Sequence, residues 1–109
     1  MTGIIAAAGN NWSGMAGTNW NTRILPVRVL GKCGGSVSDI IDGMLWAVGL
    51  AVPGVPLNPY PAQVLNLSLG GWSPGGCTAG YEEALNRVRA TGALVVAAAG
   101  NDDTESAYV

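Results

Sequence analysis

Apolar positions along the chain change their spacing several times, and each spacing predicts a different element. Three short runs, 24–30, 63–68 and 93–98, are rich in Val, Leu and Ile and lead into glycine. Length, composition and flanking glycines are typical of strands. The third run is apolar at every position, as expected of a strand covered on both faces of a sheet. Pro26 removes one hydrogen-bond donor from the first run and places it near a strand start or a sheet irregularity.

Helical spacing appears between these runs. Ser36 is suited to cap a helix that continues to Gly49, and a second helix is expected to end at Thr91 before Gly92. The apolar faces of these two helices are formed by Ile40, Ile41, Met44, Leu45 and Val48, and by Tyr81, Ala84, Leu85 and Val88. Residues 2–8 are interpreted as the end of a further helix that stops at Gly9.

The order strand, helix, strand, helix, strand predicts two crossovers and a parallel sheet, hence an α/β fold. The 109 residues suffice for one domain and are too few for two. Residues 10–20 are a polar loop rich in Gly and Asn, and 52–61 hold four of the six prolines, so both stretches are interpreted as surface loops.

Composition narrows the function. Only 11% of residues are charged, well below the roughly 25% of an average domain, while 49% are hydrophobic. With so few charges, some apolar faces are expected to lack cover, which suggests that the chain is a piece of a larger protein.

Five basic residues are too few to neutralise a run of phosphates, so nucleic acid is not an expected partner. The sequence contains no window of about 18 uninterrupted apolar residues, so it predicts no membrane span. With no His, the chain cannot supply an imidazole base.

The two cysteines, Cys33 and Cys77, both lie in glycine-rich loops. A disulfide fits such loops better than a buried thiol, so a pair is expected, with two unrelated free cysteines as the alternative. A disulfide would indicate an oxidising compartment.

Ligands of open parallel sheets bind beyond the carboxyl ends of the strands. Here these ends are built from small residues, at 31–35, 68–71 and 99–103. A phosphate site is disfavoured because the Walker and GxGxxG spacings are absent. A nucleophilic Ser68 is disfavoured because no His exists to activate it.

An extended peptide suits this edge better, because backbone groups next to glycine can pair with it as an added strand. Asn101 follows the last strand, and its neutral amide can donate to a developing oxyanion. An ordinary turn residue is the alternative interpretation of Asn101.

Three blocks together resemble the subtilisin-like serine peptidases. They are ILPVRVLG at 24–31, VLNLSLGG at 64–71 and VVAAAGN at 95–101, in the family's order and spacing. The resemblance implies the family's three-layer parallel-sheet fold, represented by its central β-α-β-α-β portion. Residues 1–109 would then be a single partial peptidase domain, truncated at both ends. Residues 1–7 are similar to the continuation of the family's catalytic-His helix.

The resemblance also implies roles for particular residues. Asn101 matches the oxyanion-hole donor. The substrate-binding cleft would be lined by Gly34, Gly35, Ser68, Leu69, Gly70, Ala98, Ala99 and Gly100. The Asp-His-Ser triad has no counterpart in these residues, so the 109-residue stretch is predicted to be inactive alone.

Asn10 and Asn11 lie where many family members hold calcium. Oxygen ligands suit this ion, but 10–15 contain no carboxylate, so a plain Asn-rich turn is the alternative. No cofactor is expected to be required for the chemistry, and calcium would have a structural role.

The resemblance thus predicts part of a secreted, extracellular serine endopeptidase. Its partners would be a polypeptide substrate and the remainder of the peptidase domain. The alternative is a non-catalytic α/β fragment that binds a peptide or a protein partner.

Overall fold

The computed structural model describes residues 1–71, 76–101 and 103. Its elements, in chain order, are α1 (Thr2–Ala6), α2 (Val37–Ala47), β1 (Val64–Leu67), α3 (Ala79–Ala90) and β2 (Leu94–Ala97). The predicted order is confirmed from α2 to β2, with strand bounds one residue shorter at each end. The first helix ends at Ala6, two residues earlier than expected, because Ala7 is already extended.

The sheet among the described residues has two parallel strands. Val64 on β1 pairs with Leu94 on β2, and the register continues to Leu67 and Ala97. Parallel neighbours need a crossover, which α3 supplies. The chain is therefore an α/β structure, as predicted.

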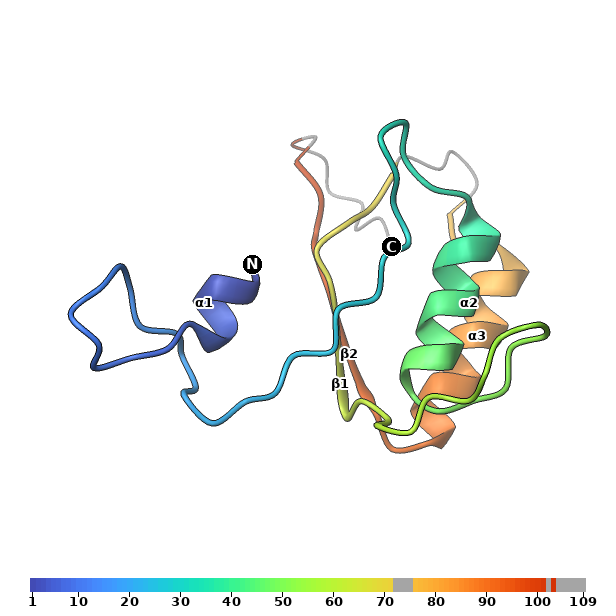
Figure 1. Ribbon diagram of the computed structural model, residues 1–109. Helices are drawn as coiled ribbons and strands as arrows, with labels where there is room; N and C mark the ends of the chain where they lie inside the picture. Colours follow the sequence, from blue (N-terminus) through green and yellow to red (C-terminus); the bar gives the residue numbers. More distant parts are fainter. Residues whose placement is uncertain (72–75, 102, 104–109) are drawn as a thin grey trace.

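The helices α2 and α3 lie side by side against one face of this sheet, and α1 lies on the other side (Figure 1). Ser36 caps α2 as predicted, since its Oγ accepts a hydrogen bond from the Asp39 backbone N–H at 3.1 Å. The core lies between the two helices and the strands. Its buried side chains include Met44, Leu45, Leu65, Ala84 and Val88.

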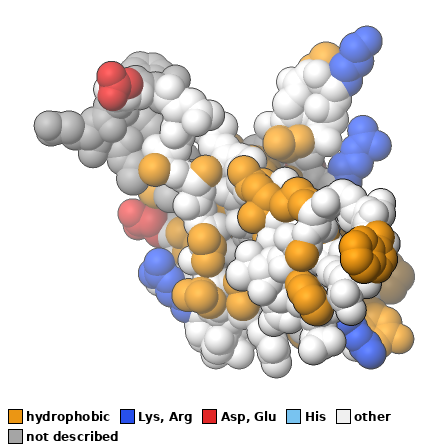
Figure 2. All heavy atoms as spheres, turned by 90° about the vertical axis from the view of Figure 1, so that its left-hand side faces the viewer, with side chains coloured by type: hydrophobic (Ala, Val, Ile, Leu, Met, Phe, Trp, Pro, Cys, Tyr) orange, Lys and Arg blue, Asp and Glu red, His pale blue; other side chains and the backbone are white. Residues whose placement is uncertain are grey.

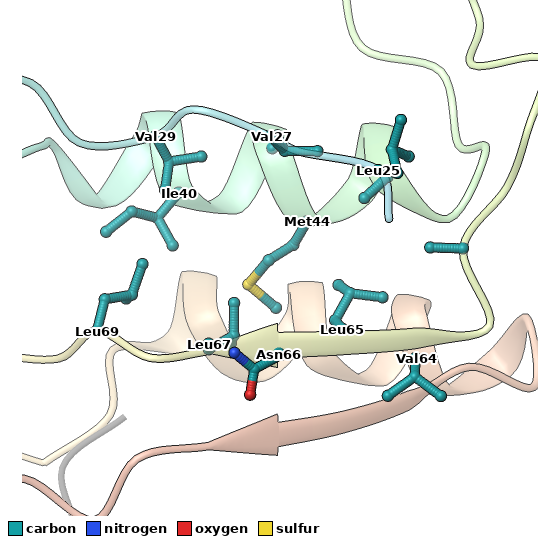
Figure 3. Close-up of a pocket in the computed structure, with 13 residues that line it drawn as sticks. Leu25, Val27, Val29, Ile40, Met44, Val64, Leu65, Asn66, Leu67 and Leu69 are labelled. Carbon is teal, nitrogen blue, oxygen red and sulfur yellow. The ribbon is translucent and has the colours of Figure 1, made fainter. Parts of the chain in front are cut away.

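The prediction of a strand at 24–30 was wrong, because this segment does not form the backbone hydrogen bonds that would pair it with β1. This segment runs alongside β1 in the same direction (Figure 3), but no backbone hydrogen bond joins it to β1. Pro26 lacks an N–H, the Arg28 Nε–H donates to the Leu30 carbonyl at 3.3 Å, and a cavity of about 140 Å³ separates the segment from β1. Val27 and Val29 still pack against the core.

The expectation that 93–98 is covered on both faces was also wrong. Leu94 and Val96 are 60% and 46% exposed, and Val64 on β1 is 56% exposed. These three side chains share one face through the strand register. Figure 2 shows hydrophobic side chains open to solvent on the side that carries α1. A sheet face without cover agrees with the expectation drawn from the low charge content.

Candidate functional site

The carboxyl ends of β1, β2 and the extended segment 24–30 lie at the same end of the molecule (Figure 1). The backbone N–H of Ala98 donates to the Leu67 carbonyl at 3.1 Å, so the two strands separate only beyond this pair. The chain stretches that leave this end are 31–35, 68–71 and 98–101. This arrangement is the edge that the sequence predicts as the site.

A tight turn forms the first of these stretches. Gly31 and Gly34 exchange two backbone hydrogen bonds, with N···O distances of 2.8 and 3.3 Å. Gly34 has a φ of 95°, a conformation that favours glycine. At Gly35 a Cβ atom would overlap the carbonyl oxygen of Val29. Glycine is therefore required at both predicted substrate-binding positions by local geometry.

The second stretch continues from β1. Ser68 and Gly70 are exposed, whereas Leu69 is half-buried against the core. The side chain of Ser68 is held by Asn66, a residue for which the sequence predicts no role. The Nδ2–H of Asn66 donates to the Ser68 Oγ at 2.8 Å. The available signal was the spacing N-x-S, which places both side chains on the same face of a strand.

The third stretch follows β2. Ala98, Ala99, Gly100 and Asn101 are all exposed, and Gly100 has a φ of 91°. The positive φ turns the backbone just before Asn101, which is therefore placed past the end of the strand. All nine predicted cleft and oxyanion residues thus lie on the stretches that leave one end of the molecule.

A groove of about 620 Å³ lies along the outer side of segment 27–31. Gly34 and Gly35 line it together with Asp39, Asp42 and Trp46 of α2. The lining of the groove combines apolar side chains with two carboxylates and the Arg28 guanidinium.

Ionisable groups are scarce at the edge. The chain contains no His, and the described residues contain no group of three His, Cys, Asp or Glu side chains that could hold a metal ion. Among the described residues, the stretches of the edge offer backbone groups, the Ser68 hydroxyl, the Asn101 side-chain amide, the Lys32 ammonium and the Cys33 thiol.

The predicted disulfide is not present: Cys33 and Cys77 are free, exposed thiols. Cys33 lies in the Gly31–Gly34 turn and Cys77 lies before α3, so each thiol belongs to a separate loop. Glycine-rich loops make both thiols accessible, but pairing also requires the loops to meet with Cα atoms within about 7 Å. Burial raises the pKa of the Tyr81 hydroxyl, and nearby Cys77 raises this pKa further.

The loop at 10–15 has the geometry of a turn. The Asn11 Oδ1 accepts a hydrogen bond from the Ser13 backbone N–H at 3.1 Å, and Asn10 and Trp12 have positive φ angles of 53° and 57°. One amide oxygen is thus already used, and the loop has no carboxylate. Calcium binding at Asn10 and Asn11 stays a prediction.

Comparisons with known proteins define the class to which this fold and edge belong. The model of the Subtilase family, Peptidase_S8, matches residues 1–109. The chain belongs to the subtilase family.

Individual relatives agree with this assignment. The chain is 50% identical over 102 residues to the "Extracellular protease" of Xanthomonas campestris, covering 94% of the chain and 17% of that protein. It is 48% identical to the "Extracellular basic protease" of Dichelobacter nodosus, covering 97% and 17%. A solved protease structure from Pseudoalteromonas arctica superposes with a TM-score of 0.91 at 50% identity, covering 97% of the chain and 31% of that structure.

The chain thus spans about a sixth of the length of these two curated relatives. Within the described residues, no helix has both the length and the apolar character needed to cross a membrane.

Proposed function

We propose that this chain forms the substrate cleft and supplies the oxyanion donor of a secreted serine endopeptidase of the subtilase family. The observation that carries the proposal is that three small-residue stretches leave the same end of the fold and that the last of them ends in Asn101. The whole-chain family match and the names of the extracellular relatives support it.

The proposed substrate is an extended polypeptide. The backbone of Gly34–Gly35 pairs with it on one side, and Ser68–Gly70 pairs with it on the other, as in β-augmentation. Ala98, Ala99 and Gly100 form the wall beside the residue that precedes the scissile bond. Small side chains suit this arrangement because they let the substrate backbone come close.

In the complete enzyme a serine Oγ attacks the peptide carbonyl while a histidine takes the serine proton. The histidine then returns this proton to the leaving amine, and water hydrolyses the acyl-enzyme. All residues of this triad would come from outside the 109 residues. Asn101 donates its amide N–H to the oxygen of the carbonyl as negative charge develops there.

A chimera tests the proposal. In this chimera, the matching residues of the present chain replace the 102-residue segment of the X. campestris protease. The hydrolysis of a chromogenic peptide by the chimera is then measured. We expect an active chimera, and the isolated chain should be inactive. Asn101→Ala should lower kcat by about 10²–10³ with little change in KM, because the donor acts on charge formed in the transition state.

Asn86→Ala, an exposed substitution on α3, is the matched control and should leave both constants unchanged. A folded chimera without activity contradicts the proposed cleft. An active chimera in which Asn101→Ala keeps its full kcat contradicts the role of Asn101.

A further inference from the structure

The stretch Ser68–Gly70 leaves the sheet at the point where its own backbone partners end. The last backbone hydrogen bond between the two strand ends joins Ala98 N–H to the Leu67 carbonyl. Among the residues that the structure describes, 68–71 make no backbone-to-backbone hydrogen bond. Two glycines follow Leu69, so the stretch has little intrinsic stiffness. Its order depends on contacts made by side chains.

One such contact is the hydrogen bond from Asn66 Nδ2 to Ser68 Oγ, at 2.8 Å. The donor is anchored firmly, because Asn66 lies within β1 between the buried Leu65 and Leu67. Its side chain points to the face of the strand opposite to theirs (Figure 3). The acceptor belongs to the first residue beyond the strand. The bond joins side chains two positions apart, which lie on one face when the chain continues as a strand, so it favours an extended Ser68.

We propose that Asn66 is a positioning residue, which keeps Ser68 extended and ready to pair with a peptide by holding its hydroxyl oxygen. This inference rests on the proposed function of the Ser68–Gly70 stretch. Because Ser68 Oγ accepts from Asn66, its own hydroxyl hydrogen remains free to donate. Asn66 itself does not touch the substrate; it acts through Ser68.

The consequence is a defect in binding and not in chemistry. A peptide paired with Ser68 gains the same backbone contacts before and during the reaction, so loss of order there weakens ground state and transition state equally. Asn66→Ala in the active chimera should therefore raise KM roughly threefold to tenfold, the effect of one net hydrogen bond, with kcat changed by less than about twofold. Asn101→Ala should instead lower kcat and leave KM almost unchanged.

A double-mutant cycle separates this role from a general structural one. Ser68→Ala removes the acceptor and should raise KM similarly, and Asn66→Ala should add nothing further in the Ser68→Ala background. If Asn66→Ala does not fold, Ser68→Ala alone still tests the inference. Asn86→Ala is the control for loss of an exposed asparagine.

Three results would overturn the inference in a chimera that is otherwise active: an unchanged KM for Asn66→Ala, an unchanged KM for Ser68→Ala, or full additivity of the two substitutions. An inactive chimera would instead count against the proposed function of the edge. The two failures are therefore distinguishable.

Discussion

The side chains of Asn58 and Trp46 hold the proline-rich loop 52–61 to α2. Asn58, which is only 5% exposed, donates from Nδ2 to the carbonyls of Ala47 at 2.9 Å and Tyr60 at 3.2 Å. Its Oδ1 accepts from the Tyr60 backbone N–H at 2.9 Å. The Trp46 indole N–H adds a hydrogen bond to the Pro56 carbonyl at 2.7 Å. Buried amide groups are stable only when their polar atoms are paired in this way.

Asn58→Ala should therefore lower the free energy of unfolding of the chain by about 2 kcal/mol, because three hydrogen bonds are lost at a buried position. Urea unfolding followed by tryptophan fluorescence measures the change. Asn86→Ala, at an exposed position, should shift the value by no more than about 0.5 kcal/mol. Equal effects of the two substitutions would show that the Asn58 network does not contribute.

For single residues, the sequence predicted the local setting, such as a loop or a strand, better than the hydrogen-bond or disulfide partner. Asn58 sits in a stretch correctly expected to be a loop, yet nothing in its neighbours predicts that it is buried under α2. Asn66 and Ser68 were recognisable as polar positions of a strand, but the hydrogen bond between them was not predicted. Cys33 and Cys77 were placed correctly in exposed loops and wrongly paired, because pairing depends on the distance between loops.

At the scale of elements, the helix α2 contains a glycine where helix propensity alone would favour alanine. Gly43 lies under segment 24–30, and a Cβ there would overlap the Val29 Cγ1 and lie 3.3 Å from the Val27 Cγ1. Valine side chains are stiff at χ1 and cannot move aside easily. Gly43 is therefore the position that lets an extended segment pack directly on a helix.

Gly43→Ala should destabilise the chain by about 1–3 kcal/mol, because the overlap with Val29 outweighs a gain in helix propensity of about 1 kcal/mol. Gly80→Ala on α3 is the matched control: its Cβ would lie 3.5 Å from Ile41 Cδ1, an ordinary contact. This control should leave stability unchanged or raise it slightly. Chemical unfolding of both variants decides, and a Gly43 variant as stable as the Gly80 variant would contradict the packing argument.

Helices and paired strands were predicted well because their signals are local. Ser36 caps α2, Gly92 follows α3, and the apolar spacing in both helices matches their buried faces. The segment 24–30 has a strand-like composition, and its half-buried Leu25, Val27 and Val29 alternate with exposed residues as in a strand. What the pattern could not predict was that no hydrogen bond to β1 would form.

At the scale of the whole molecule, the dominant feature is apolar surface without cover. The bare sheet face carries Val64, Leu94 and Val96, and α1 contains no buried residue. Patches of this kind mark surfaces that associate with other protein surfaces. The low charge content of the sequence predicted this property without locating it.

The purified 109-residue chain should bind a hydrophobic dye and self-associate, as measured by dye fluorescence and by sedimentation. Replacing Leu94 and Val96 by serine should reduce both signals, because these side chains are 60% and 46% exposed on the bare face. Leu57→Ser is the control, since Leu57 is 63% exposed on the proline-rich loop. A compact monomer that ignores the dye would contradict this account of the surface.

The sequence by itself determined the α/β class, the two helices with their caps, the paired strands and the set of small residues at one edge. These features follow from spacing, capping and glycine conformation, which act over a few residues. Only the tertiary structure decided that segment 24–30 stays unpaired, that both thiols remain free, that one sheet face is bare and that Asn66 holds Ser68. Each of these depends on distances between stretches of chain or on side-chain geometry, and spacing along the sequence does not fix such distances.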